Sequence, residues 1–197
     1  CVGRKRELVS TPVKKKALEY NIPVFQPEKV KLDYEEIALA RPDIIITCAY
    51  GQIIPKVLLD LPRLGCINVH ASLLPYLRGG APLHHAIIDG YKETGVTIMY
   101  MDEAMDTGDI ISSVTYPLKD TDTVGTVHDN LMEMGANLLM ETLPSIIKGT
   151  NKRIKQDNSK ATYAYNISRS DEHLDFTKEG ITIDRKVRGL NPWPLAN

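Results

Sequence analysis

The chain has 197 residues, of which 43% are hydrophobic and 25% are charged, and its formal net charge is −1. These values are typical of a globular domain and exclude a disordered chain, a collagen and a coiled coil. A domain of this size buries about 70% of the surface of its unfolded chain, which predicts a substantial core. No apolar run reaches the ~18–20 residues that cross a bilayer, so we expect no membrane partner.

The start of the chain and its cysteines indicate its setting. The sequence opens at Cys1 without an initiator methionine or a signal-peptide pattern, which predicts a fragment or a chain lacking its first residues. Cys1, Cys48 and Cys66 form no CxxC pair, and three thiols cannot all be bridged. Reduced thiols in a cytoplasmic protein are therefore favoured over a disulfide framework or a zinc site.

Positive charge gathers in the first 16 residues, which hold six basic side chains and one acidic one. A basic segment can contact the phosphates of a nucleic acid while the rest of the protein stays mildly acidic. A solvated loop followed by an exposed helix face explains the same pattern, so both interpretations stay open.

Helical and strand periods of hydrophobicity alternate along the chain. We expect a helix that begins at Thr11-Pro12 and further helices at 33–39, 56–61, 82–89, 123–147 and 179–190. The helix at 123–147 is expected to kink before Pro144. Strands are expected at 43–48, 65–70, 94–101 and 110–117, the last two as an antiparallel pair, with a short extended piece at 22–25. The pattern predicts an α/β domain with a doubly wound, mainly parallel sheet over 1–150. Residues 151–197 are expected to end that domain and to form a linker toward a further one.

Two polar residues share one face of a predicted strand near its carboxyl end. Asn68 and His70 alternate with Ile67 and Val69, so they project together while the apolar pair enters the packing. That edge of an α/β sheet is where ligands bind. An amide N–H and a group that titrates near neutrality can stabilise a developing oxyanion and move a proton. A hydrogen-bonded structural pair is the alternative.

An acidic loop follows the next predicted strand, with carboxylates at Asp102, Glu103, Asp106 and Asp109. One of them, placed beside His70, would orient the imidazole and stabilise its cationic form. A solvated acidic turn and a metal site are the alternatives. We disfavour a metal because no second histidine lies nearby and no HxH or HExxH spacing occurs.

Other catalytic patterns are missing from the sequence. No GxSxG elbow surrounds Ser72, and no base is evident beside Cys66, so covalent catalysis is disfavoured. No GxGxxG or Walker A pattern supports a nucleotide cofactor. His84 and His85 are adjacent on a predicted helix, so they point about 100° apart and are not expected to converge.

These segments together resemble the 10-formyltetrahydrofolate-dependent formyltransferase family. The matching segments are 68–75, 78–82, 93–99, 101–102 and 106–109. Three flanking segments favour the branch that formylates methionyl-initiator-tRNA, namely the basic loop and helix start at 2–14, the segment 49–55, and the linker 188–194. The match runs over nearly the whole of this sequence. The resemblance implies that the sequence lacks the family's first strand and its carboxy-terminal barrel.

The resemblance implies a Rossmann-like formyltransferase fold, 10-formyltetrahydrofolate as co-substrate, methionyl-initiator-tRNA as partner, a monomer, and no metal. Its catalytic trio would be Asn68, His70 and Asp106. Its folate contacts would be Ser72, Leu73, Leu74, Pro75, Tyr50, Gly51, Gln52, Ile53 and Asp102. Its contacts with the tRNA acceptor end would be Arg4, Lys5 and Arg6.

The implied mechanism is formyl transfer without a covalent enzyme intermediate. The Asn68 amide and a protonated His70 would stabilise the tetrahedral oxyanion, while Asp106 holds His70 and helps a water to remove the amine proton. A formyltetrahydrofolate hydrolase or a formyltransferase acting on a small amine would share this trio. A metal-dependent hydrolase and a non-catalytic ligand-binding module are more distant alternatives.

Overall fold

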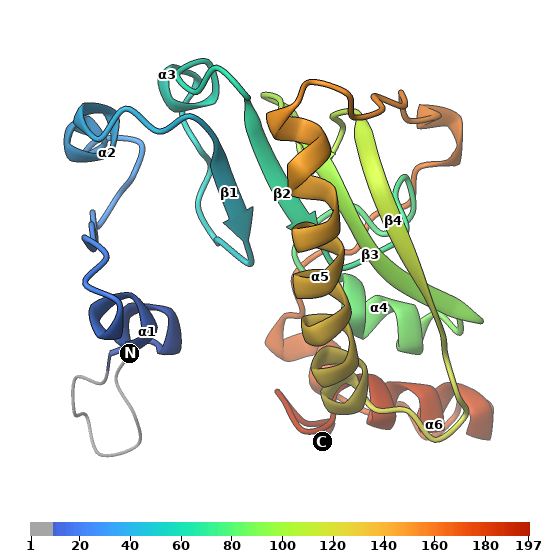
Figure 1. The fold of residues 1–197 in the computed structure, drawn as a ribbon. Helices are drawn as coiled ribbons and strands as arrows, with labels where there is room; N and C mark the ends of the chain where they lie inside the picture. Colours follow the sequence, from blue (N-terminus) through green and yellow to red (C-terminus); the bar gives the residue numbers. More distant parts are fainter. Residues whose placement is uncertain (1–9) are drawn as a thin grey trace.

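The computed structural model describes residues 10–197, which form a four-stranded sheet flanked by helices (Figure 1). The strands are β1 (Ile45–Cys48), β2 (Cys66–His70), β3 (Glu93–Tyr100) and β4 (Ile110–Pro117), and they lie in the order β1-β2-β3-β4. β1 and β2 are parallel, whereas β2–β3 and β3–β4 are antiparallel.

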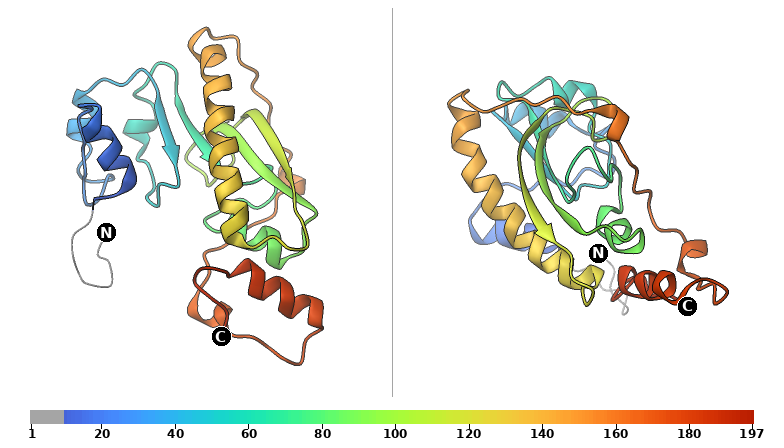
Figure 2. Two further views of the ribbon diagram at one scale, coloured as in Figure 1. Left: turned by 60° about the horizontal axis from the view of Figure 1, so that its bottom comes forward. Right: turned by 90° about the vertical axis from the view of Figure 1, so that its right-hand side faces the viewer.

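Helix α5 (Val124–Ile147) covers one face of this sheet (Figures 1 and 2). Thr123 begins the helix as a capping box with Thr126, and Gly149 follows its end with a φ of 66°. Its apolar stripe packs on the β2 residues that alternate with Asn68 and His70 and on neighbouring residues of β3. The strand residues are Ile67, Val69, Val96 and Ile98, and the helix residues are Leu131, Leu138 and Ile146. The second face of β2 is therefore left for polar side chains.

The loop between β2 and α4 lies on the face of the sheet opposite α5, as the second view of Figure 2 shows. Helix α4 (Pro82–Ile88) begins at a proline in its first turn and also packs against α5, where Ile87 shares a core with Val124, Val127 and Leu131. Helix α6 (Gly180–Gly189) packs against α4, and the Gly189 carbonyl accepts a hydrogen bond from His84 Nδ1 at 2.7 Å. His85 instead contacts Asp89 and the Tyr165 carbonyl, so the two histidines do not converge, as expected.

Three short helices lie on the β1 side of the sheet in Figure 1: α1 (Pro12–Glu19), α2 (Glu35–Leu39) and α3 (Lys56–Leu59). A small core of Val30, Ile54 and Leu58 joins the α2 and α3 region to β1 through Ile45. Two 3₁₀ turns, η1 (Asn158–Lys160) and η2 (Arg169–Glu172), interrupt the irregular segment after α5.

The α/β class and the predicted strands and helices are confirmed, with ends that differ by a few residues. The sheet is mixed rather than mainly parallel over residues 10–197. The connection 71–92 does not return the chain to the amino-terminal end of β2, so β3 begins beside the carboxyl end of β2 and runs antiparallel to it. Helix α5 continues through Pro144 to Ile147. No helix within 10–197 combines the length and apolar character of a membrane span.

Candidate active site

Asn68 and His70 project from the last residues of β2 on the face opposite α5. Their cross-strand partners are Met99 and Thr97 of β3. His70 is 5% exposed and Asn68 is half-buried, so this end of the strand holds two polar side chains that are largely removed from solvent. Polar groups in such a setting need hydrogen-bond partners.

A threonine of the neighbouring strand orients the Asn68 amide. Thr47 Oγ1 lies 2.9 Å from Asn68 Oδ1 and donates to it. The register of the parallel pair places Thr47 directly beside Asn68. Because the amide oxygen is engaged in this way, Nδ2 keeps both of its N–H donors, and neither has a partner among residues 10–197. The site therefore contains one oriented amide with unused donors.

The His70 ring lies between a backbone carbonyl and a carboxylate. Nε2 lies 3.1 Å from the Leu77 oxygen, and Nδ1 lies 3.8 Å from Asp106 Oδ2. A carbonyl oxygen only accepts, so Nε2 carries the proton of this hydrogen bond. The gap at Nδ1 is longer than a hydrogen bond, so in the described chain this nitrogen faces the carboxylate without a direct bond to it.

Asp106 is held beside His70 by a backbone donor. Its Oδ2 accepts a hydrogen bond from the Gly79 N–H at 2.8 Å, and its own φ is 54°. Gly79 has a φ of 117°, and a Cβ there would lie 2.6 Å from the Ala164 oxygen. Only glycine fits such a position, so the Gly79 conformation and the placement of Asp106 depend on each other.

A buried arginine supports the Asp106 loop through a glutamine. Gln156 Nε2 donates to the carbonyls of Asp106 and Gly108 at 2.9 and 2.8 Å. Its Oε1 accepts from Arg78 Nε and Nη2 at 3.1 and 2.7 Å, and Arg78 is 2% exposed. None of the ion pairs within 10–197 includes Arg78, so the amide oxygens of Gln156 and Asn158 satisfy this cation. The sequence analysis missed Gln156, because no local motif marks it.

Replacing Gln156 with leucine should lower the free energy of unfolding by about 2–3 kcal/mol, because the buried Arg78 guanidinium loses two charge-assisted hydrogen bonds. Urea denaturation measures this change. The exposed Gln26 provides the control, and its replacement with leucine should change stability by less than about 0.5 kcal/mol. Equal losses in the two variants would contradict the support that we assign to Gln156.

The other carboxylates of the acidic loop are engaged elsewhere. Asp102 Oδ1 accepts from the Ala104 N–H and from Thr107 Oγ1, which shapes the turn. Glu103 pairs with Lys56 at 2.9 Å, and Asp109 pairs with Arg153 at 3.1 Å. Of the four carboxylates, the structure brings Asp106 to His70.

The expected folate-contact residues divide by exposure. Tyr50, Gly51, Gln52, Ile53 and Asp102 are exposed, and Leu73 and Pro75 are half-buried. Ser72 is 0% and Leu74 is 7% exposed, and the Ser72 hydroxyl bonds the Tyr76 carbonyl. The Gln52 amide holds the segment 28–30 by contacts with Val30 N and Glu28 O. The geometry thus leaves Tyr50, Ile53 and Leu73 as the side chains available to a ligand, and gives Ser72, Leu74 and Gln52 internal contacts.

Two features of residues 10–197 bear on the alternative chemistries. No group of three or more potential metal ligands occurs within residues 10–197. Burial, with the Asp60 charge as a smaller cause, raises the pKa of the Cys66 thiol to about 11, so this thiol stays protonated at neutral pH.

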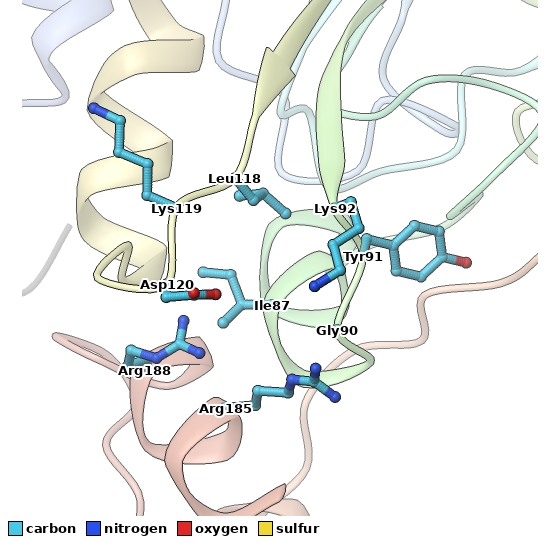
Figure 3. A pocket seen from close by; sticks show the side chains of 9 residues that line it. All are labelled: Ile87, Gly90, Tyr91, Lys92, Leu118, Lys119, Asp120, Arg185 and Arg188. Carbon is cyan, nitrogen blue, oxygen red and sulfur yellow. The ribbon is translucent and has the colours of Figure 1, made fainter. Parts of the chain in front are cut away.

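A hollow of about 280 Å³ lies between α4, α6 and the turn after β4 (Figure 3). Four basic side chains and Asp120 are among its lining residues, and none of the catalytic candidates is.

The expected RNA contacts Arg4, Lys5 and Arg6 lie outside the described residues. Their assignment remains a prediction from the sequence.

Comparison with known proteins gives two family matches. The model of a family described as formyl transferase matches residues 1–143. The model of the formyl transferase C-terminal domain matches residues 166–197.

Curated relatives and solved structures agree with these matches. A methionyl-tRNA formyltransferase from Geobacillus sp. is 57% identical over 98% of this chain and 62% of its own length. A 4-N formyltransferase from Francisella tularensis has a TM-score of 0.78 at 23% identity, over 93% of this chain and 74% of that chain. An N-formyltransferase from Helicobacter canadensis, solved with folinic acid and dTDP-3-aminofucose, has a TM-score of 0.75 at 24% identity, over 92% and 65% of the two chains. The two solved structures support the fold.

Proposed function

This chain belongs to the formyl transferase family, and on that basis we propose that it transfers the formyl group of 10-formyltetrahydrofolate to the α-amino group of methionyl-initiator-tRNA. The observation that supports the proposal is that Asn68 and His70 share one face at the end of β2, with Asp106 Oδ2 3.8 Å from Nδ1 of the His70 ring. The chain spans 62% of the length of the Geobacillus relative, so substrate, partners, the cytoplasmic setting and the monomeric state belong to the proposal.

The Asn68 amide is the donor that we assign to the oxyanion. When the neutral amine attacks the formyl carbon, the new C–N bond forms and the carbonyl oxygen gains negative charge. Asn68 Nδ2 has unused N–H groups, and Thr47 already holds the amide in one orientation. A preoriented donor of this kind stabilises the transition state by about 3–4 kcal/mol.

For His70 we propose the role of proton acceptor, in place of the oxyanion donor that the family resemblance implied. Its Nε2–H is spent on the Leu77 carbonyl, so Nδ1 is the nitrogen left to exchange a proton. Nδ1 can take the proton that the attacking amine releases and return it to the folate N10 as the C–N10 bond breaks. The reaction is then balanced, with the formyl group moved and one proton relayed.

Asp106 stabilises the imidazolium that forms in this relay. Its carboxylate lies 3.8 Å from Nδ1, which leaves room for an amine or a water to contact both groups. The Gly79 N–H holds the carboxylate and the Gln156 amide holds the backbone carbonyl of Asp106, and neither donor neutralises the charge. A carboxylate that is held by hydrogen bonds and keeps its charge is suited to stabilise a transient cation.

Side chains available for the folate ring lie on the β1 side of the trio. Tyr50 is 44% and Ile53 is 82% exposed, and both follow β1 within a few residues. Flat aromatic ligands are held by apolar and aromatic side chains with a few polar groups, which agrees with this set.

The test is to incubate the chain with 10-formyltetrahydrofolate carrying a labelled formyl group and with methionyl-initiator-tRNA, and to follow label in formylmethionyl-tRNA. We expect transfer. Release of free formate would instead indicate a hydrolase, and transfer only to small amines would indicate a different formyltransferase. Loss of activity on chelation would indicate a metal-dependent enzyme, and binding of folate without loss of the formyl group would indicate a binding module.

Replacing Arg4, Lys5 and Arg6 together with alanine should weaken tRNA binding and reduce the slope of log affinity against log salt by about 2–3, because up to three phosphate contacts are lost. Filter binding of methionyl-initiator-tRNA at several salt concentrations measures this slope. The control is a variant with alanine at Lys14, Lys15 and Lys16, which removes the same number of positive charges. Equal slopes in the two variants would contradict a specific role for the first cluster.

A further inference from the structure

Two tyrosines of the irregular segment after α5 form an exposed stack. The rings of Tyr163 and Tyr165 lie 6.1 Å apart between centroids, with an angle of 12° between their planes. Tyr163 is 47% and Tyr165 is 68% exposed. Neither phenol hydroxyl has a hydrogen bond within residues 10–197, so stacking is the contact that pairs these rings. Each ring keeps surface that a third flat group can cover.

The backbone that carries this stack is hydrogen-bonded to the loop 77–81, which contacts His70 and Asp106. Arg78 N donates to the Thr162 oxygen at 2.9 Å, and Ala164 N donates to the Arg78 oxygen at 2.7 Å. The Ala164 oxygen in turn accepts from Ala81 N at 3.1 Å. The segment 162–164 therefore runs beside the loop that supplies the Leu77 acceptor to His70 and the Gly79 donor to Asp106.

The register determines the side on which the tyrosines lie. Thr162 contacts Leu77 N and Tyr91 through its hydroxyl, and Ala164 is fully buried, so these alternate residues face inward. Tyr163 and Tyr165 share the opposite side of this extended segment. Tyr163 is the bridge partner of Arg78. The Arg78 side chain leads through Gln156 to the backbone of Asp106, so the segment that carries the stack is tied to the residue that supports the Asp106 loop.

We propose that Tyr163 and Tyr165 form a stacking platform for an unpaired nucleotide at the 3′ end of the RNA substrate. The inference rests on the proposed function, which requires the aminoacylated end of an RNA to reach the trio. Exposed aromatic side chains on a rigid backbone are the usual means of holding single-stranded bases. An adjacent base on this platform brings the aminoacyl ester toward Asp106 and His70.

The first test compares kinetics on methionyl-initiator-tRNA. Changing both tyrosines to leucine should raise the KM for this substrate about tenfold, with kcat and the KM for 10-formyltetrahydrofolate unchanged. Changing both to phenylalanine keeps the rings and should leave the KM near its original value. Phe176→Leu, which removes another exposed aromatic ring (79%), provides the control for a general surface effect.

The second test measures binding without catalysis. The probe is a 5′-labelled RNA hairpin with an unpaired 3′ CCA end, compared with the same hairpin made blunt, by fluorescence anisotropy. The leucine variant should lose affinity about tenfold for the first hairpin and not for the second. Equal affinities of the original chain for both hairpins, or an unchanged affinity of the variant, would overturn the platform.

The two tests separate the platform from the proposed function. Transfer to methionyl-tRNA with an unaltered KM in the leucine variant would overturn the platform and leave the function standing. Absence of transfer, together with loss of 3′-end binding in the variant, would overturn the function and support the platform. Circular dichroism of each variant verifies that the fold is retained.

Discussion

Replacing Asn68 with alanine should lower kcat for formyl transfer about 10²- to 10³-fold while the Kd for 10-formyltetrahydrofolate stays within a few-fold of its original value. The reason is that Nδ2 is the preoriented donor without another partner in the described chain, so its contribution is largest when charge develops on the formyl oxygen. Single-turnover kinetics and equilibrium binding of the folate measure the two quantities separately.

Asn130→Ala provides the matched control for this change. Asn130 is an exposed asparagine of α5, and its side chain bonds the carbonyl of Thr126 within the same helix. We expect it to leave kcat unchanged. If Asn68→Ala weakened folate binding as much as it lowered kcat, the residue would serve binding or folding rather than the transition state.

Replacing Asp106 with asparagine should lower kcat about 10²- to 10⁴-fold, because the imidazolium of His70 loses its carboxylate partner. The asparagine oxygen can still accept the hydrogen bond from Gly79 N, so the loop should keep its position. Transfer kinetics measure the loss, and urea denaturation should give a stability close to that of the original chain.

The control for Asp106 lies at the end of the same loop. Asp109→Asn removes an equal charge from a carboxylate that pairs with Arg153 rather than with His70. We expect its kcat to stay within a few-fold of the original. A comparable loss in both variants would show that the total charge of the loop matters, and not the contact with the imidazole.

The parts of the fold with strong local periods could be predicted from sequence. The alternation at 66–70 places Ile67 and Val69 against α5 and Asn68 and His70 on the other face, as the core contacts of Ile67 and Val69 with α5 residues show. Helix α5 has both an apolar stripe and a threonine cap. The antiparallel pairing of β2 with β3 could not be predicted in this way, because it depends on the short α4 and on how the loop before it folds.

The candidate site was predicted less completely than the fold. Alternation in a strand placed Asn68 beside His70, and the structure brings Asp106 to within 3.8 Å of the ring. Gln156 was not predicted, because its contact with the Asp106 loop joins residues 50 apart through tertiary packing. Burial of Ser72 was also invisible locally, since its hydroxyl turns to the Tyr76 carbonyl.

The central claim is that Asn68, His70 and Asp106 together surround the formyl group during transfer. A crystal structure of the chain with a non-transferable 10-formyl folate analogue tests it most directly. The formyl oxygen should lie about 3 Å from Asn68 Nδ2, with the formyl carbon facing the gap between His70 Nδ1 and Asp106 Oδ2. A formyl group bound away from this end of β2, for instance in the basic hollow between α4 and α6, would contradict the claim.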